Sequence, residues 1–133
     1  MAHLTDVRVG RHSGFDRVVF EFGGPGVPAL ALERVSPPFE KDPSGLPLRV
    51  PGTSFVRVQL VDASGEGYAT VDGTPTYTGP ATFKPRYPRL TSLVRAGDYE
   101  GYVTWIAGLT GRTCVRVLAL SGPARLVIDF QAP

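Results

Sequence analysis

Glycine and proline interrupt this chain so often that long helices have no room to form. Of the 133 residues, 16 are Gly and 13 are Pro, and the longest stretch without either runs from Thr53 to Ser64. Proline removes a backbone donor, and glycine costs about 1 kcal/mol relative to alanine inside a helix. The spacing of these residues therefore predicts short strands joined by turns.

The longest uninterrupted stretch has the two-residue period of a strand. Val56, Val58 and Leu60 alternate with Arg57 and Gln59, so one face is apolar and the other polar. The same reasoning predicts strands near residues 4–10, 15–22, 28–36, 46–50, 53–63, 89–96, 98–107, 113–120 and 124–131. So many short strands indicate an all-β fold, a two-sheet β-sandwich. We expect one domain over residues 4–133, preceded by flexible residues 1–3.

Two segments share one pattern and predict the centre of the core. Residues 17–22 (RVVFEF) and 125–130 (RLVIDF) both read Arg, apolar, Val, apolar, acid, Phe. Alternation along a strand places the apolar residues of each segment on one face. The predicted core residues are Val18, Phe20, Phe22, Leu126, Ile128 and Phe130.

The opposite face of these segments carries charge. Arg17 and Glu21 share that face in the first segment, as Arg125 and Asp129 do in the second. If the register allows, these side chains pair across neighbouring strands. One interpretation is a solvated ladder of charges in which each pair contributes little. The other is a charged strip that faces a ligand.

Composition argues against several classes of partner. The net charge is +2, from 14 basic and 12 acidic residues, and the basic residues are scattered along the sequence. We therefore expect no nucleic-acid partner. The single Cys114 excludes an internal disulfide and a thiolate metal cluster. No apolar run is long enough for a transmembrane segment.

The chain offers little catalytic machinery. His3 and His12 are isolated from any nucleophile motif, and two histidines with one cysteine make a poor zinc site. We expect no cofactor, no metal and no enzymatic activity. The best contrary case is a glycan hydrolase that uses Asp98 and Glu100. Two apart on a strand, their carboxylates would lie about 6 to 7 Å apart on one face.

Tyrosines suggest where a ligand is bound. Tyr77, Tyr99 and Tyr102 lie between residues 68 and 105, as does Trp105, for which we expect a place in the core. Tyrosine presents a flat apolar face with a polar tip, which suits stacking on sugars or contact with a protein. Tyr77 lies in residues 65–88, a segment whose weak pattern predicts a long surface loop and is too broken for the core.

Several stretches together resemble the AMIN-like domain family of actinobacterial secreted proteins and lipoproteins. They are residues 6–12 (DVRVGRH), 14–22 (GFDRVVFEF), 76–80 (TYTGP), 97–101 (GDYEG) with 104–105 (TW) and 108–109 (GL), and 125–129 (RLVID). The resemblance implies a β-sandwich related to the AMIN domains of cell-wall amidases. It also implies a non-catalytic domain that targets the cell envelope, with peptidoglycan as the usual ligand. Members normally follow an export signal, which we expect to have been removed from this chain.

Residues and resemblance together give a leading hypothesis and two rivals. The leading one is an extracytoplasmic module that binds peptidoglycan or another cell-wall polymer. Its expected contact residues are Tyr77, Tyr99, Glu100, Tyr102, Arg17, Glu21, Arg125 and Asp129. The first rival is a protein-interaction domain of an exported lipoprotein, which offers a strand edge or the 65–88 loop to an envelope protein. The second is the hydrolase that uses Asp98 and Glu100.

Overall fold

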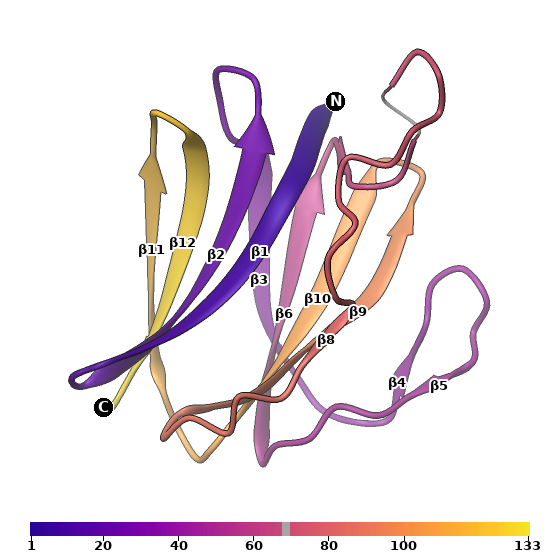
Figure 1. The fold of residues 1–133 in the computed structure, drawn as a ribbon. Helices are drawn as coiled ribbons and strands as arrows, with labels where there is room; N and C mark the ends of the chain where they lie inside the picture. The colour runs from indigo at the N-terminus through magenta and orange to yellow at the C-terminus, as the bar shows by residue number, and fades with distance from the viewer. Residues whose placement is uncertain (68–69) are drawn as a thin grey trace.

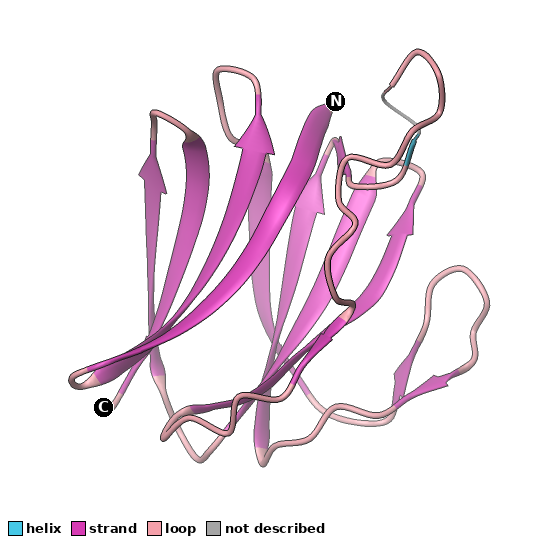
Figure 2. Ribbon diagram, in the orientation of Figure 1, coloured by secondary structure: helices cyan, strands magenta, loops and turns pink. Residues whose placement is uncertain are grey.

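A computed structural model describes residues 1–67 and 70–133, and its regular structure is almost entirely β (Figure 2). The predicted all-β sandwich is confirmed. In chain order the strands are β1 (Ala2–His12), β2 (Phe15–Gly23), β3 (Ala29–Val35), β4 (Phe39–Glu40), β5 (Pro47–Leu48), β6 (Ser54–Val61), β7 (Ala63–Ser64), β8 (Thr82–Phe83), β9 (Leu90–Tyr99), β10 (Tyr102–Leu109), β11 (Cys114–Leu120) and β12 (Ala124–Gln131).

The strands form two main sheets and a separate hairpin. Sheet A has the order β11-β12-β2-β1-β7, and sheet B has the order β3-β6-β10-β9-β8. The remaining pair, β4 and β5, forms a small hairpin that projects from the side of sheet B (Figure 1). Neighbouring strands are antiparallel except for β1 and β7. The long strands of the two sheets lie face to face (Figure 1).

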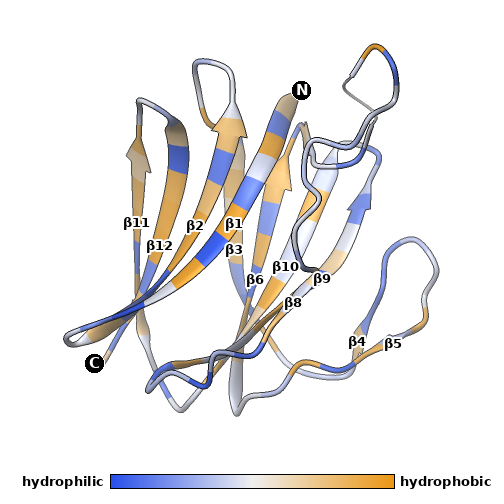
Figure 3. Cartoon of the chain, viewed as in Figure 1, coloured by the Kyte–Doolittle hydropathy of each residue, from blue (hydrophilic) through white to orange (hydrophobic). Residues whose placement is uncertain are grey.

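One apolar core fills the space between the sheets. Strands alternate between hydrophobic and hydrophilic residues along their length (Figure 3), and the hydrophobic residues of both sheets meet in one cluster. Trp105 is fully buried, and its ring meets that of Phe20 edge-on at 6.1 Å. All six residues predicted for the core, and Trp105 with them, belong to this cluster.

Two strand boundaries differ from the prediction, each for a structural reason. We expected a break at Gly97, but β9 continues through it to Tyr99 and the turn to β10 lies at Glu100–Gly101. Both turn residues have positive φ, 51° and 85°, as a tight two-residue hairpin requires. At the other end of the chain, β1 already begins at Ala2, because Ala2 and His3 pair with β7.

The segment predicted as a long surface loop is anchored to the core by Tyr77. Residues 68 and 69 of this loop lie outside the described residues. Tyr77 is only 6% exposed, packs edge-on against Trp105, and donates a hydrogen bond from its hydroxyl to the carbonyl of Pro80. Burial raises the pKa of its phenol. The expectation that this segment is too broken for Tyr77 to belong to the core was wrong, because Tyr77 packs against Trp105 of β10 and the neighbouring Thr76 hydroxyl donates a hydrogen bond to the carbonyl of Leu4 in β1.

We predict that Phe130→Ala lowers the free energy of unfolding by about 3–5 kcal/mol, since it removes a fully buried ring from the shared core. Urea unfolding followed by tryptophan fluorescence measures the change. Leu46→Ala is the matched control, because Leu46 is 59% exposed and its truncation should change stability by less than about 0.5 kcal/mol. Equal losses in the two variants would contradict the assigned core.

Candidate functional site

The outer face of sheet B carries a second, smaller apolar cluster. Phe55, Val94 and Ile106 project from the sheet, and the segment with the β4–β5 hairpin covers them with Phe39 and Val50. The rings of Phe39 and Phe55 meet edge-on at 5.0 Å. Burial of these side chains holds the hairpin against the sheet. The hairpin therefore forms a raised wall beside β9.

Two glycines allow the hairpin segment to approach the sheet this closely. A Cβ atom on Gly97 would lie 2.7 Å from the carbonyl oxygen of Asp42, whose own N–H donates to the carbonyl of Ala96. A Cβ atom on Gly108 would lie 1.9 Å from the carbonyl oxygen of Pro51. Any larger residue would push the segment away at these points. Gly97 is thus a contact point within a strand, which explains why it does not end one.

A groove runs between this wall and β8, and basic side chains line it. Its larger hollow has a volume of about 440 Å³, and a second hollow of about 320 Å³ shares Arg49, Pro51 and Lys84 with the first. The floor is formed by Val94 and its neighbours on β9. We call the two hollows together the basic groove. Its cationic lining residues are Lys41, Arg49, Lys84, Arg86 and Arg95, which include both lysines of the chain.

These five cations have no anionic partner among the described residues. In residues 1–67 and 70–133, Arg8, Arg17, Arg57 and Arg116 form ion pairs, whereas no ion pair or side-chain hydrogen bond involves the five groove cations. The lining also includes three acids, Asp42, Glu66 and Asp98, so its cations outnumber its acids by five to three. A concave surface with a net charge of one sign attracts ions of the opposite sign. The groove is therefore suited to an anionic ligand.

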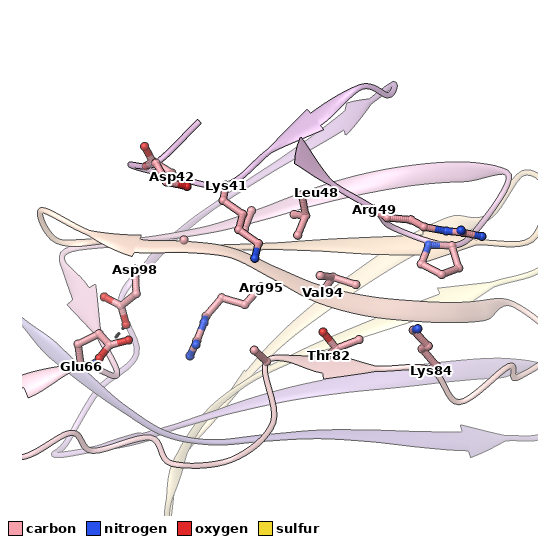
Figure 4. Close-up of a pocket in the computed structure, with 15 residues that line it drawn as sticks. Lys41, Asp42, Leu48, Arg49, Glu66, Thr82, Lys84, Val94, Arg95 and Asp98 are labelled. Carbon is pink, nitrogen blue, oxygen red and sulfur yellow. Dashed lines mark hydrogen bonds between the residues drawn. The ribbon is translucent and has the colours of Figure 1, made fainter. Parts of the chain in front are cut away.

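The charge of the groove varies along its length. Figure 4 shows Arg49 and Lys84 on opposite walls at one end, Glu66 and Asp98 at the other, and Lys41 and Arg95 between them. The carboxylate of Asp98 is already occupied, because it accepts hydrogen bonds from the Ser64 hydroxyl at 2.8 Å and the Gly65 N–H at 2.7 Å. The positive potential is thus greatest at the Arg49–Lys84 end.

The paired carboxylates assumed for a hydrolase do not share a strand face. Asp98 lies in β9, but Glu100 lies in the turn with positive φ, because the hairpin turn falls at 100–101. Asp98 also holds the 64–66 turn through its hydrogen bonds, including one from the N–H of Glu66. The two-apart strand geometry proposed from the sequence was therefore wrong, and the role left for Asp98 is a structural one.

The charged strip predicted on β2 and β12 exists, but the carboxylate of Asp129 is hydrogen-bonded to arginines of the same protein. Asp129 is fully buried and lies opposite Arg17 in the register. Arg17 donates two hydrogen bonds to its carboxylate, at 2.7 and 3.0 Å, and Arg116 donates a third at 2.7 Å. The predicted pairing across strands is confirmed for Arg17 and Asp129, and the carboxylate of Asp129 has no exposed surface.

The other members of the strip pair elsewhere. Glu21 lies opposite Arg125 but accepts a hydrogen bond from Arg8 at 3.0 Å. Arg125 donates instead to the backbone carbonyls of Pro123 and Ser121. These contacts lie on the outer face of sheet A, away from the basic groove. The strip is therefore not the solvated ladder described from the sequence, because Asp129 is fully buried in a charge network with Arg17 and Arg116. A role of its exposed members as ligand contacts stays a prediction.

Tyr99 and Tyr102 are exposed, but neither lines the groove. They face each other across the β9–β10 turn, with exposed fractions of 38% and 45%. Their role as ligand contacts stays a prediction. Among the described residues, no group of three or more His, Cys, Asp or Glu side chains is placed to hold a metal ion.

The basic groove cannot be recognised from the sequence because its residues are far apart in the chain. Lys41 and Arg49 belong to the hairpin segment, Lys84 and Arg86 follow β8, and Arg95 lies in β9. Only the fold of the hairpin onto sheet B brings them together. One feature of the sequence could have indicated the groove, because both lysines lie in segments rich in proline and polar residues.

Comparison with known families gives one match. The family model described as AMIN-like domain matches residues 2–132. No curated protein matches the chain. Within the described residues, none of the helical structure has the length and apolar character needed to cross a membrane.

We predict that Asp129→Asn lowers stability at neutral pH by about 2 kcal/mol, because it weakens charge-assisted hydrogen bonds to a buried acceptor. Burial raises the pKa of Asp129, but the hydrogen bonds from Arg17 and Arg116 outweigh it, and the net pKa is lowered. The stabilisation is therefore complete above an unfolded-state pKa of about 3.9 and is lost as the pH falls through the lower folded-state value.

Urea unfolding between pH 7 and pH 2 tests this directly. The difference between wild type and Asp129→Asn should shrink as the pH falls below about 4. Glu33→Gln is the control, because Glu33 pairs with Arg57 at the surface and should contribute less than about 1 kcal/mol. A difference that stays constant with pH would show that the charge of Asp129 does not stabilise the fold.

Proposed function

The chain belongs to the AMIN-like domain family, and from this premise we propose that it is a non-catalytic binding module that holds a cell-wall polymer in the basic groove. Membership of this family is consistent with a domain that acts at the cell wall, outside the cytoplasm. The observation that carries the proposal is the set of five unpaired cations along two continuous hollows.

The shape of the groove supports a chain-like ligand. Its two hollows share one wall and extend from Glu66 past Arg95 to Arg86, so the site is elongated. Cell-wall polymers carry anionic groups along an extended backbone, and such groups would meet the cations in succession. The lining combines charged and polar side chains with apolar ones, among them Leu48, Ala81 and Val94. An open groove that carries charged side chains favours recognition by charge and hydrogen bonds over enclosure of an apolar molecule.

We predict that Arg95→Glu weakens binding to insoluble cell-wall fragments by about tenfold or more, because a reversed charge in the groove repels an anionic ligand. Co-sedimentation with purified fragments measures the loss. Arg112→Glu is the matched control, since it changes the net charge equally at an exposed turn outside both hollows. Equal retention of all three proteins would contradict the groove as the site, and no retention of wild type would contradict the function.

A second candidate function rests on a different feature, the exposed edge strand β11. It is the outermost strand of sheet A, and Val117, Leu118 and Leu120 are each between 37% and 40% exposed. The strand contains neither proline nor lysine, the residues that usually protect an edge from pairing. An extended segment of an envelope protein would add to this edge as a further antiparallel strand.

The only cysteine of the chain provides a test of that candidate. Cys114 is exposed at the first position of β11, so a thiol-linked photo-crosslinker can be attached there without substitution. We predict that Val117→Lys abolishes the capture of an envelope protein, because a charge on the edge strand opposes strand addition. A probe at Leu46→Cys in a Cys114→Ser background is the control. The same adducts from both probe positions, or formation of a dimer of this chain, would oppose the candidate.

A further inference from the structure

The end of the basic groove furthest from Glu66 has a lining without acidic side chains. The smaller hollow is formed by Arg49, Pro51, Lys84, Arg86 and Thr91. Arg49 comes from the hairpin segment after β5, whereas Lys84 and Arg86 follow β8, so the cations stand on different walls. In Figure 4, which draws the larger hollow, Arg49 and Lys84 lie on opposite sides of the region that the two hollows share. Three cations from two walls therefore surround one open space.

We infer that this end binds the phosphodiester groups of a linear anionic polymer, an inference that rests on the proposed function and names its ligand class. A carboxylate is planar, and a single arginine can occupy both of its oxygens. A phosphodiester is tetrahedral, so its anionic oxygens point in different directions and accept from separate walls. Arginine offers a planar fork and lysine a compact point charge, and both are common partners of phosphate.

The remaining cations of the groove fit a ligand with repeated phosphodiester groups. Lys41 and Arg95 line the larger hollow beyond the shared residues Arg49 and Lys84. A single phosphate would engage only one end of this row. A polymer with a phosphodiester in each repeat places further anions beside Lys41 and Arg95. The polymer thus accounts for all five cations with one kind of contact.

The recessed shape distinguishes such a polymer from a lipid surface. The cations lie between the hairpin wall and β8, over a floor of β9 that includes buried Val94. A thin chain can enter this space along its length. A bilayer presents its phosphates in a plane and contacts the most protruding residues first, such as Leu46 near the hairpin turn. The groove therefore favours the polymer.

The direct experiment is titration of the whole chain with poly(glycerol phosphate), with polyglutamate as the polycarboxylate and phosphatidylglycerol vesicles as the lipid arm. We expect wild type to bind the phosphate polymer, with an affinity that falls as salt rises. Lys84→Glu and Arg86→Glu should each weaken binding by about tenfold or more, whereas Lys84→Arg and Arg112→Glu should bind as wild type does. Unfolding curves establish that each variant is folded.

Three outcomes would overturn the inference. They are equal affinity for polyglutamate, binding to vesicles but not to the soluble polymer, and equal losses in Arg86→Glu and Arg112→Glu. Tight binding of the phosphate polymer that depends on Lys84 and Arg86 would support it.

Cell-wall fragments separate this inference from the broader function. Cold hydrofluoric acid cleaves phosphodiesters and leaves the peptidoglycan network. If the protein sediments with untreated fragments but not with stripped fragments, both proposals stand. If it sediments equally with both, the module binds the wall and the phosphodiester inference fails. If it sediments with neither, the proposed function itself fails.

Discussion

Burial of one face of each sheet against the other is the constraint on which the rest of this structure depends. Because the inner faces supply the apolar core around Trp105, they leave little room for charge. Asp16, on the inner face of β2, is buried and accepts hydrogen bonds from the N–H groups of Arg89 and Leu90. The two notable charge arrangements consequently lie outside, one on sheet A and one on sheet B.

These two arrangements use arginine in opposite ways. On sheet A, Arg17 and Arg116 satisfy the buried carboxylate of Asp129, so removal of the acid would leave an unbalanced network in the fold. Beside sheet B, Arg49 and Arg95 line a groove and form no ion pair within the described residues. The first arrangement is self-contained and stabilises the protein. The second has unused hydrogen-bonding and electrostatic capacity, which is the property expected of a binding surface.

Features that depend on the local alternation of residues could be predicted from the sequence. Features that depend on contacts between distant segments could not. The core positions around Phe20 and Ile128 were correct because a strand buries every second residue. Tyr77 was misplaced because its segment has no period, although one aromatic ring in a loop can still enter a core. Family resemblance identified the fold family across the chain. Neither the family resemblance nor any residue periodicity indicated the groove, since its cations come together only when the hairpin segment packs against sheet B.

Gly97 illustrates how fold and candidate site are linked. From the sequence, a glycine between two strand patterns indicates a turn, and the true turn three residues later was overlooked. In the structure, the missing side chain of Gly97 admits the backbone of Asp42, and this contact sets the height of the hairpin above β9. The same hairpin carries Lys41 and Arg49 over the groove. The absence of a side chain at Gly97 thus lets the hairpin segment lie close to β9, and this places the cations of the hairpin segment in the same groove as Arg95.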